Sequence, residues 1–228
     1  MNISDLYIRT MDDLTEAVEE LGFLPFFDNS IPGFSIEEHV DPRAWYNGAD
    51  DSWAVWDWKG PVINTLNCAY GKFFEKKAAY ISRAWFPDFA NYRRDGYDFD
   101  ARYEDGLAYI GDKRLYDLIT ANAPVLSRRL KGLGNYRKGG NKGFDTMINR
   151  LQAQGYVIIS DFVYMIDKNG ERYGWGVAEY STPEAFLGED FTNAVYRRTP
   201  AESYERLFAH VRSILPYADD AMIRRFLK

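Results

Sequence analysis

The sequence predicts an α+β fold that is mainly helical, with a winged helix-turn-helix core, an aromatic-rich N-terminal region and C-terminal helices. Two observations carry this prediction. Over residues 111–181, three helical patterns come before two strand patterns joined by the turn pair Asn169-Gly170. The chain ends in helical patterns, and aromatic residues make up 17% of it. We therefore expect an N-terminal region over 1–110 packed on the core, a winged core over 111–181 and a helical segment over 182–228.

The N-terminal region begins with one clear helix and continues as loops. Thr10 and Asp13 have the spacing of a capping box for a helix over residues 11–21, and Gly22 ends it. Prolines, glycines, asparagines and aspartates recur through residues 23–60, which favours loops and short turns. We expect four tryptophan rings to anchor these loops to the body: Trp45, Trp53, Trp56 and Trp58.

Residues 61–100 are aromatic and basic in patches, and their pattern is mixed. The poor alternation around residues 72–81 fits either a strand or a pair of short helices. Arg93 and Arg94 follow, beside tyrosines and aspartates. They either pair with the neighbouring acids as surface arginines or contact phosphates with aromatic support.

The core has a helix-turn-helix pattern at its start. Asp112 caps the first expected helix, and Pro124 lies in the first turn of the second. The apolar positions of that second helix are Val125, Leu126, Leu130 and Leu133. A third helix is expected over residues 144–154, and its buried face has the helical spacing of Phe144, Met147, Ile148 and Leu151. Strands over 156–166 and 173–180 form the hairpin that follows.

The C-terminal segment has clear helix-start patterns. Thr182 and Thr199 each come before a proline and can cap a helix. After the second threonine, Glu202 completes a capping box. We expect a helix over residues 200–215 and a last short helix that begins at Asp219.

The composition bears on several classes of site. The single cysteine, Cys68, excludes an internal disulfide and a cysteine-based zinc site, and it fits a reducing compartment. The two histidines, His39 and His210, are far apart, so a histidine-rich metal site is not expected. A solvated face is favoured over a metal site for the acids of the loop stretch: Glu37, Glu38, Asp41, Asp50, Asp51 and Asp57.

We accordingly expect no cofactor and no metal. The N-terminal residues lack a basic stretch followed by an apolar core, so no signal peptide is expected. No window approaches 18 uninterrupted apolar residues, so no membrane-spanning segment is expected. The predicted location is therefore the cytoplasm.

Positive charge is concentrated in one segment of an otherwise acidic chain. Residues 127–150 contain seven basic residues and one acid, a local charge of +6, whereas the whole chain carries −6 and the remainder therefore −12. The cations of this segment are Arg128, Arg129, Lys131, Arg137, Lys138, Lys142 and Arg150. Together with Lys168 and Arg172 at the hairpin tip, they are candidate phosphate contacts, which would make DNA affinity strongly salt-dependent.

In a winged helix-turn-helix, the third helix lies in the major groove and its exposed side chains contact base edges. Here the outward face offers Asn149 and Arg150, beside Asp145, Thr146 and Gln152. We therefore expect double-stranded DNA as the partner. Winged helices also serve protein contacts, so a non-catalytic regulator or protein-interaction module, with a protein partner, is the alternative.

Several stretches carry a resemblance to a known family. The order of elements from Asp112 to Tyr180, the motif Leu151-Gln152-Ala153-Gln154 and the run Thr182-Pro183-Glu184 resemble the AlkZ-related proteins. YGKFF, ISRAWFP, FANYRRDGYDFDARY and YGWGVAEYSTPE strengthen the likeness, which covers most of the chain. These proteins are small relatives of the AlkZ/YcaQ bacterial DNA glycosylases, which excise alkylated or crosslinked bases.

The resemblance implies a monofunctional DNA glycosylase, a hydrolase of N-glycosyl bonds that acts on damaged duplex DNA. Those enzymes position water with a glutamine-apolar-glutamine motif, which implies Gln152 and Gln154 as catalytic residues here. Asp161 is a candidate base, and Tyr156 and Trp175 are candidates to pack against a flipped nucleobase. Residues two apart face the same side only in an extended segment, so both amides can face one substrate only if this segment is not regular helix.

Overall fold

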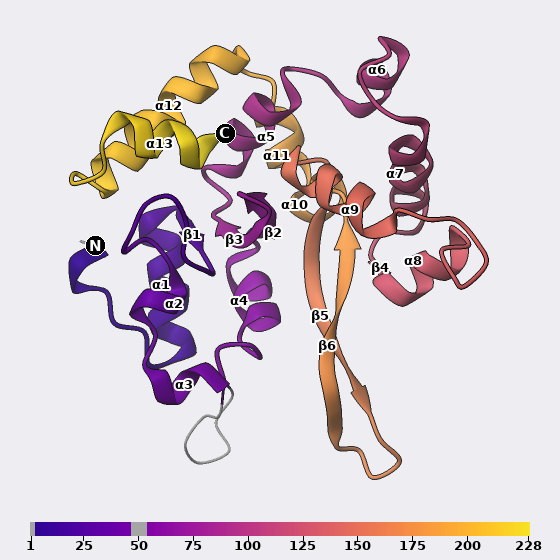
Figure 1. Cartoon of the computed structure of the whole chain (residues 1–228), viewed down its shortest axis with the longest axis horizontal. Helices are drawn as coiled ribbons and strands as arrows, with labels where there is room; N and C mark the ends of the chain where they lie inside the picture. Colours follow the sequence, from indigo (N-terminus) through magenta and orange to yellow (C-terminus); the bar gives the residue numbers. More distant parts are fainter. Residues whose placement is uncertain (1–2, 47–53) are drawn as a thin grey trace.

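The structure, a computed structural model, describes residues 3–46 and 54–228. Asp50, Asp51 and Trp53, which were singled out above, lie outside these residues. The described residues form an α+β fold with a six-stranded antiparallel sheet and helices around it (Figure 1). The α+β class predicted from the sequence is confirmed.

The sheet joins strands from both halves of the chain. The strands are β1 (Phe23–Pro25), β2 (Ala69–Phe74), β3 (Lys77–Ile81), β4 (Val125–Leu126), β5 (Ile158–Ile166) and β6 (Arg172–Ser181). Their order across the sheet is β1-β3-β2-β5-β6-β4. The pair Tyr70 and Ile159 connects β2 to β5, so the early strands and the later strands form one continuous sheet.

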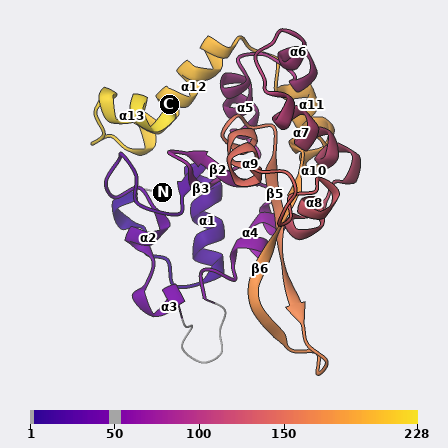
Figure 2. The ribbon, with the colours of Figure 1, turned by 45° about the vertical axis from the view of Figure 1, so that its right-hand side comes forward.

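The helices surround this sheet, and the β5–β6 hairpin extends well beyond them (Figures 1 and 2). In the first half they are α1 (Met11–Leu21), α2 (Ile36–His39), α3 (Pro42–Tyr46), α4 (Lys59–Leu66), α5 (Phe86–Arg94), α6 (Phe99–Glu104) and α7 (Ile110–Asn122), after a 3-10 turn, η1 (Ile3–Asp5). In the second half they are α8 (Ser127–Leu133), α9 (Phe144–Ala153), α10 (Pro183–Leu187), α11 (Glu189–Ala194), α12 (Pro200–Ile214) and α13 (Asp220–Leu227).

The predicted N-terminal helix is confirmed as α1. The Thr10 side chain accepts from the Asp13 amide, and the Asp13 carboxylate accepts from the Thr10 amide, which completes the capping box. Gly22 ends the helix with φ +74°, and a Cβ there would lie 2.5 Å from the Trp85 ring. Of the two possibilities left open for residues 72–81, the structure has the strand, as part of the β2–β3 pair.

Tryptophan rings anchor the loop stretch as predicted, at least for the described ones. Trp45 and Trp56 lie edge to face with ring centroids 5.4 Å apart. Trp56 also lies 5.1 Å from the ring of Phe26, which is fully buried. Trp58 is itself buried.

Two predictions for the start of the core are wrong. Asp112 does not cap its helix: α7 begins at Ile110, and Asp112 lies buried within its first turn. Pro124 is not in the first turn of α8, which begins only at Ser127. The residue before a proline is driven toward extended backbone, so α7 ends there, and the next residues form the short strand β4 on β6.

Most of the remaining predictions for the later elements are confirmed, with one exception at Leu133. On α9 the residues Phe144, Ile148 and Leu151 are buried, and β5 and β6 form the predicted hairpin. Thr182 and Thr199 cap α10 and α12, the second with a complete capping box. Asp219 caps α13. Leu133, expected to be apolar packing on the second helix, is instead 47% exposed at the end of α8.

Arg94 corrects the expectation of a surface arginine. It is 1% exposed, and its guanidinium donates to the Glu184 carboxylate at 2.7 Å, to the Gly155 carbonyl at 2.7 Å and to the Tyr196 hydroxyl at 3.0 Å. It therefore fastens α5 to the end of α9 and to α10. A buried arginine with these partners is a structural tie within the core.

Candidate nucleic-acid interface

The basic segment divides into cations that are engaged within the protein and cations that are free. Lys131 pairs with Asp145 at 3.5 Å and lies over the Phe144 ring. Arg128 contacts the Met165 sulfur of the hairpin. In the part of the chain that the structure describes, no hydrogen bond or ion pair holds the side chains of Arg129, Arg137, Lys138 and Lys142. These four belong to α8 and to the turn that follows it.

The tip of the β5–β6 hairpin is a built turn with exposed charge. The Asp167 carboxylate accepts from the amides of Asn169, at 2.7 Å, and Glu171, at 2.9 Å, which fixes the turn. Lys168 is exposed on this turn, and Arg172 lies with its guanidinium 5.1 Å from the Tyr164 ring centroid. Both cations therefore lie at the end of the projecting hairpin, as the sequence indicates.

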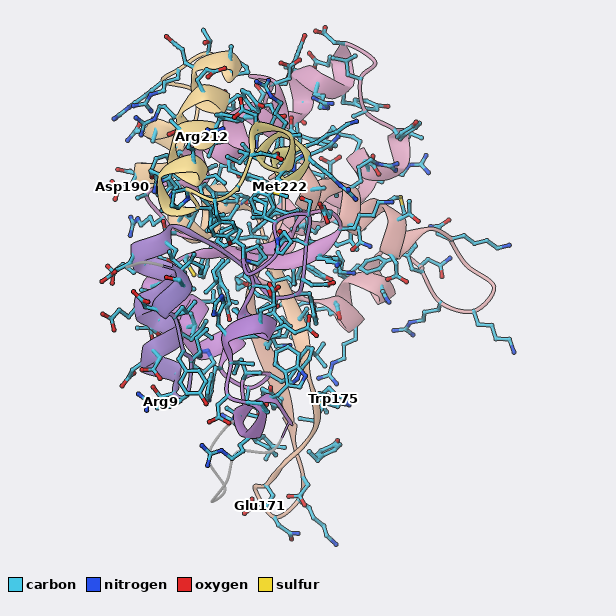
Figure 3. The ribbon with its side chains drawn as sticks, turned by 60° about the vertical axis from the view of Figure 1, so that its left-hand side comes forward. Arg9, Glu171, Trp175, Asp190, Arg212 and Met222 are labelled. Carbon is cyan, nitrogen blue, oxygen red and sulfur yellow. The ribbon has the colours of Figure 1, made fainter. Side chains whose placement is uncertain are left out.

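The outer half of the hairpin also exposes apolar surface. Ile166, Tyr173 and Trp175 are 55%, 51% and 76% exposed. Between the pairs Val163–Val177 and Met165–Tyr173, β6 has two more residues than β5, and this bulge contains Trp175. Figure 3 shows Trp175 and Glu171 on the projecting hairpin, far from Asp190, Arg212 and Met222. Large exposed rings on a projecting element are typical of a contact surface.

The third helix of the predicted core is held from one side by an ion pair. Arg150 donates from Nε and Nη2 to the two carboxylate oxygens of Asp112, at 2.7 and 2.9 Å, and lies over the Tyr109 ring. Asp112 is 2% exposed, and its hydrogen bonds raise the pKa of the Arg150 guanidinium. Arg150 therefore fastens α9 to α7 and is engaged within the protein.

The outward side of α9 borders a hollow. A cavity of about 410 Å³ is lined by Thr146, Asn149, Arg150 and Ala153 of α9 and by Lys76 of the β2–β3 turn. Asn149 is therefore accessible, but next to another element of the protein.

The two glutamines of the motif are in different surroundings. Gln152 is 1% exposed; its Oε1 accepts from the Lys72 amide of β2 at 3.1 Å, and its Nε2 donates to the Ile148 carbonyl at 3.2 Å. Gln154 is the partly exposed C-cap of α9. Since the segment is helical through Ala153, the two amides point to different sides. The structure does not bring them together, and their catalytic role stays a prediction.

The other residues named for catalysis, Asp161, Tyr156 and Trp175, lie in three different kinds of surroundings. Asp161 lies opposite Glu179 on the paired strands, and burial raises the pKa of the Glu179 carboxyl, with the nearby Asp161 charge acting in the same direction. Tyr156 is fully buried and donates to the Tyr97 carbonyl, so it is a core residue and not a wall for a flipped base. Trp175 is the exposed one of the two aromatic candidates.

Lys59 is a residue that the sequence did not single out. It is the first residue of α4, and its Nζ lies 4.2 Å from the Phe162 ring centroid and 4.9 Å from that of Trp56. Burial lowers the pKa of its amine to about 8, although the nearby charge of Asp57 acts in the opposite direction. Trp56 and Trp58, which come shortly before it in the sequence, were the available hint.

Comparison with known families adds to this geometry. The model of a family described as AlkZ related matches residues 8–228. The chain belongs to the AlkZ-related family. The resemblance found in the sequence is thereby confirmed for almost the whole chain. No curated protein and no solved structure matches this AlkZ-related chain.

Two properties of the AlkZ-related protein concern other kinds of site. Among residues 3–46 and 54–228, no three histidine, cysteine, aspartate or glutamate side chains gather as they would around a metal ion. None of the helices in the same residues has the length and apolar character needed to cross a membrane.

Proposed function

We propose that this protein binds double-stranded DNA through a winged helix-turn-helix and is a functional relative of the AlkZ glycosylases. The succession α7, β4, α8, α9, β5, β6, with β4 paired to β6, is consistent with that fold. Membership of the AlkZ-related family supports the relation to enzymes that act on DNA bases.

The strongest support is the free positive charge of α8 and of the turn between α8 and α9. The whole chain carries −6, yet Arg129, Arg137, Lys138 and Lys142 have no ion-pair partner among the described residues. Elsewhere cations are often paired, as Lys77 is with Asp28. Unpaired cations on a projecting turn of an acidic protein are suited to a polyanion, because binding releases counterions from the phosphates.

The neighbouring elements then take complementary roles. The turn cations contact phosphates and set the position of the protein on the duplex. The hairpin, with Lys168 and Arg172 at its tip, lies along the backbone or in the minor groove. Thr146 and Asn149 are the side chains of α9 that can reach base edges, whereas Arg150 holds α9 in place.

Charge reversal of the turn tests DNA binding. The double variant Lys138→Glu, Lys142→Glu should bind duplex DNA more weakly, and the slope of log affinity against log salt should fall by about 2, or about 0.9 per lost phosphate contact. Fluorescence anisotropy across a salt series measures both. The matched control is Lys77→Glu, Arg83→Glu, which changes the charge equally at cations that pair with Asp28 and Asp190. Equal weakening by both double variants, or no salt-dependent binding by the parent, would contradict the proposal.

A non-catalytic winged-helix module is the second candidate, and one observation favours it. Both ends of the Gln152 amide are bonded to backbone inside the protein, so this side chain is occupied. Incubation with duplex DNA carrying an alkylated base separates the candidates. Release of the base by the parent, lost in Gln154→Ala with DNA binding intact, supports a glycosylase. Binding without release supports the non-catalytic module.

A further inference from the structure

An amine lies between aromatic rings beside the projecting hairpin. The Nζ of Lys59 faces the rings of Phe162 on β5 and Trp56. Among the described residues it has no hydrogen bond and no ion pair within 4 Å. The carboxylate two residues before it, Asp57, instead accepts a hydrogen bond from the Tyr164 hydroxyl. Lys59 is therefore partly buried, and within residues 3–46 and 54–228 its close contacts are with the faces of these two rings.

The fold holds this amine in place. Gly60, which follows it, lies so close to the hairpin that a Cβ would be 2.4 Å from the Asp161 carboxylate. The start of α4, where Lys59 lies, is thus packed closely against β5. Burial lowers the amine pKa to about 8, so roughly one tenth is unprotonated at pH 7. A lysine desolvated in this way is an activated nucleophile toward carbonyl groups.

The exposed ring of the hairpin lies beside one of the two rings that face this amine. The Trp175 ring lies 6.5 Å from the Trp56 ring, centroid to centroid, and Trp56 in turn faces Lys59. Trp175 is 76% exposed, on the element proposed to contact DNA. If Trp175 enters a gap in the base stack, the sugar at that gap would therefore lie on the side of the amine.

We propose that Lys59 is a nucleophilic amine that forms an imine with the aldehyde of a ring-opened abasic sugar in DNA. This rests on the proposed DNA binding, but not on base removal by this protein. A sugar without its base opens to a C1′ aldehyde, and the gap in the stack admits an aromatic ring.

The chemistry needs no oxidant or further reactant. The unprotonated Nζ attacks C1′: the C–N bond forms, the π bond of the carbonyl breaks, and one amine proton passes to the oxygen to give a carbinolamine. The second amine proton and the hydroxyl then leave as water, which gives the imine, whose C=N bond water can later hydrolyse. Asp57, Tyr164 and Asp161 are the titratable groups of the surroundings that can exchange these protons.

Reductive trapping tests the imine directly. The full-length protein is mixed with a duplex containing one abasic site and sodium cyanoborohydride, which reduces an imine to a stable secondary amine. A covalent protein–DNA band is expected with this duplex and not with an intact one, and peptide mapping should find the adduct on Lys59. Lys59→Arg keeps a cation over the two rings but cannot form the imine, so trapping should fall at least tenfold while anisotropy shows unchanged duplex binding.

Lys76→Arg is the matched control, since Lys76 lies on the β2–β3 turn away from these rings and should leave trapping unchanged. Duplex binding without trapping, or equal trapping by Lys59→Arg, overturns the role of Lys59 and leaves DNA binding standing. Absence of both binding and trapping overturns the two together.

Discussion

Helix α9 and the outer half of the β5–β6 hairpin carry similar polar and charged residues, yet they use them in opposite ways. On α9, Arg150 and Gln152 are bonded within the protein. On the hairpin, Lys168 and Trp175 are exposed. The difference comes from the neighbouring elements. Helix α9 packs against both α7 and β2, whereas β5 and β6 pair with other strands of the sheet only near the base of the hairpin (Figure 1).

The type of a residue therefore does not decide between a structural role and a binding role. The elements packed around a residue decide its role, because a polar side chain that they enclose must form its hydrogen bonds within the protein. Substitutions of the enclosed residues Arg150 and Gln152 on α9 should therefore change the free energy of unfolding, and substitutions on the outer hairpin should change binding.

The largest effect is expected at Arg150. Arg150→Ala leaves the buried Asp112 carboxylate without its bidentate partner, which should lower the free energy of unfolding by about 3 kcal/mol. Urea denaturation monitored by circular dichroism measures this. Asn149→Ala, the adjacent position, has no side-chain hydrogen bond among the described residues and should cost less than about 0.5 kcal/mol. If Arg150→Ala is as stable as the parent and binds DNA more weakly, Arg150 has a binding role, as proposed for the outer hairpin, and not a structural one.

Gln152 should show the next largest effect. Gln152→Ala leaves the Lys72 amide of β2 without its acceptor, so the free energy of unfolding should fall by about 2 kcal/mol. Gln154→Ala, at the partly exposed end of the same helix, should change it by less than about 0.5 kcal/mol. Thermal unfolding of the two variants side by side tests the contrast, and equal stability would mean that Gln152 is not a structural link.

Much of the fold could be predicted because its signals are local. Capping threonines, a helical apolar face and the Asn169-Gly170 turn lie within a few residues of what they determine, and each was found where the sequence indicated. The wrong predictions depend on distant partners. The local sequence around Asp112 is that of a helix cap, but its carboxylate is bonded to Arg150, 38 residues away. The strand after Pro124 forms because β6 pairs with it.

In the candidate site, too, features with local sequence signals could be predicted, and features that depend on distant residues could not. The free charge of the turn could be predicted because no other element covers Lys138 and Lys142. The environment of Lys59 could not, since Phe162 reaches it from a strand about a hundred positions later in the chain. The burial of Gln152 depends likewise on the β2 backbone.

Trp175 should affect binding and not folding. Trp175→Ala removes a ring that is 76% exposed, so the free energy of unfolding should change by less than about 0.5 kcal/mol. If the ring stacks on a nucleobase, DNA affinity should fall by about 1 kcal/mol, or roughly fivefold, in anisotropy titrations. Leu107→Ala, an exposed apolar residue outside the hairpin, is the control. Loss of stability with unchanged affinity would show that the outer hairpin is structural as well.

The smallest expected effect is a change in stability with pH at Glu179, and it tests whether the base of the hairpin is shielded from water. Glu179 lies opposite Asp161 near the base, and burial raises the pKa of its carboxyl. A raised pKa means that ionisation costs more in the folded state, so the contribution of Glu179 to stability is full below its unfolded pKa, near 4.3, and is lost as pH rises through the folded value. Glu179→Gln has no such loss. Its stability relative to the parent should therefore increase from pH 4 to pH 7, by less than about 0.5 kcal/mol because the carboxyl is only partly buried. Urea denaturation of both proteins at these two pH values measures the change. A difference that does not depend on pH would mean that water reaches the base of the hairpin as freely as its tip, and the contrast with α9 would then extend along the whole hairpin.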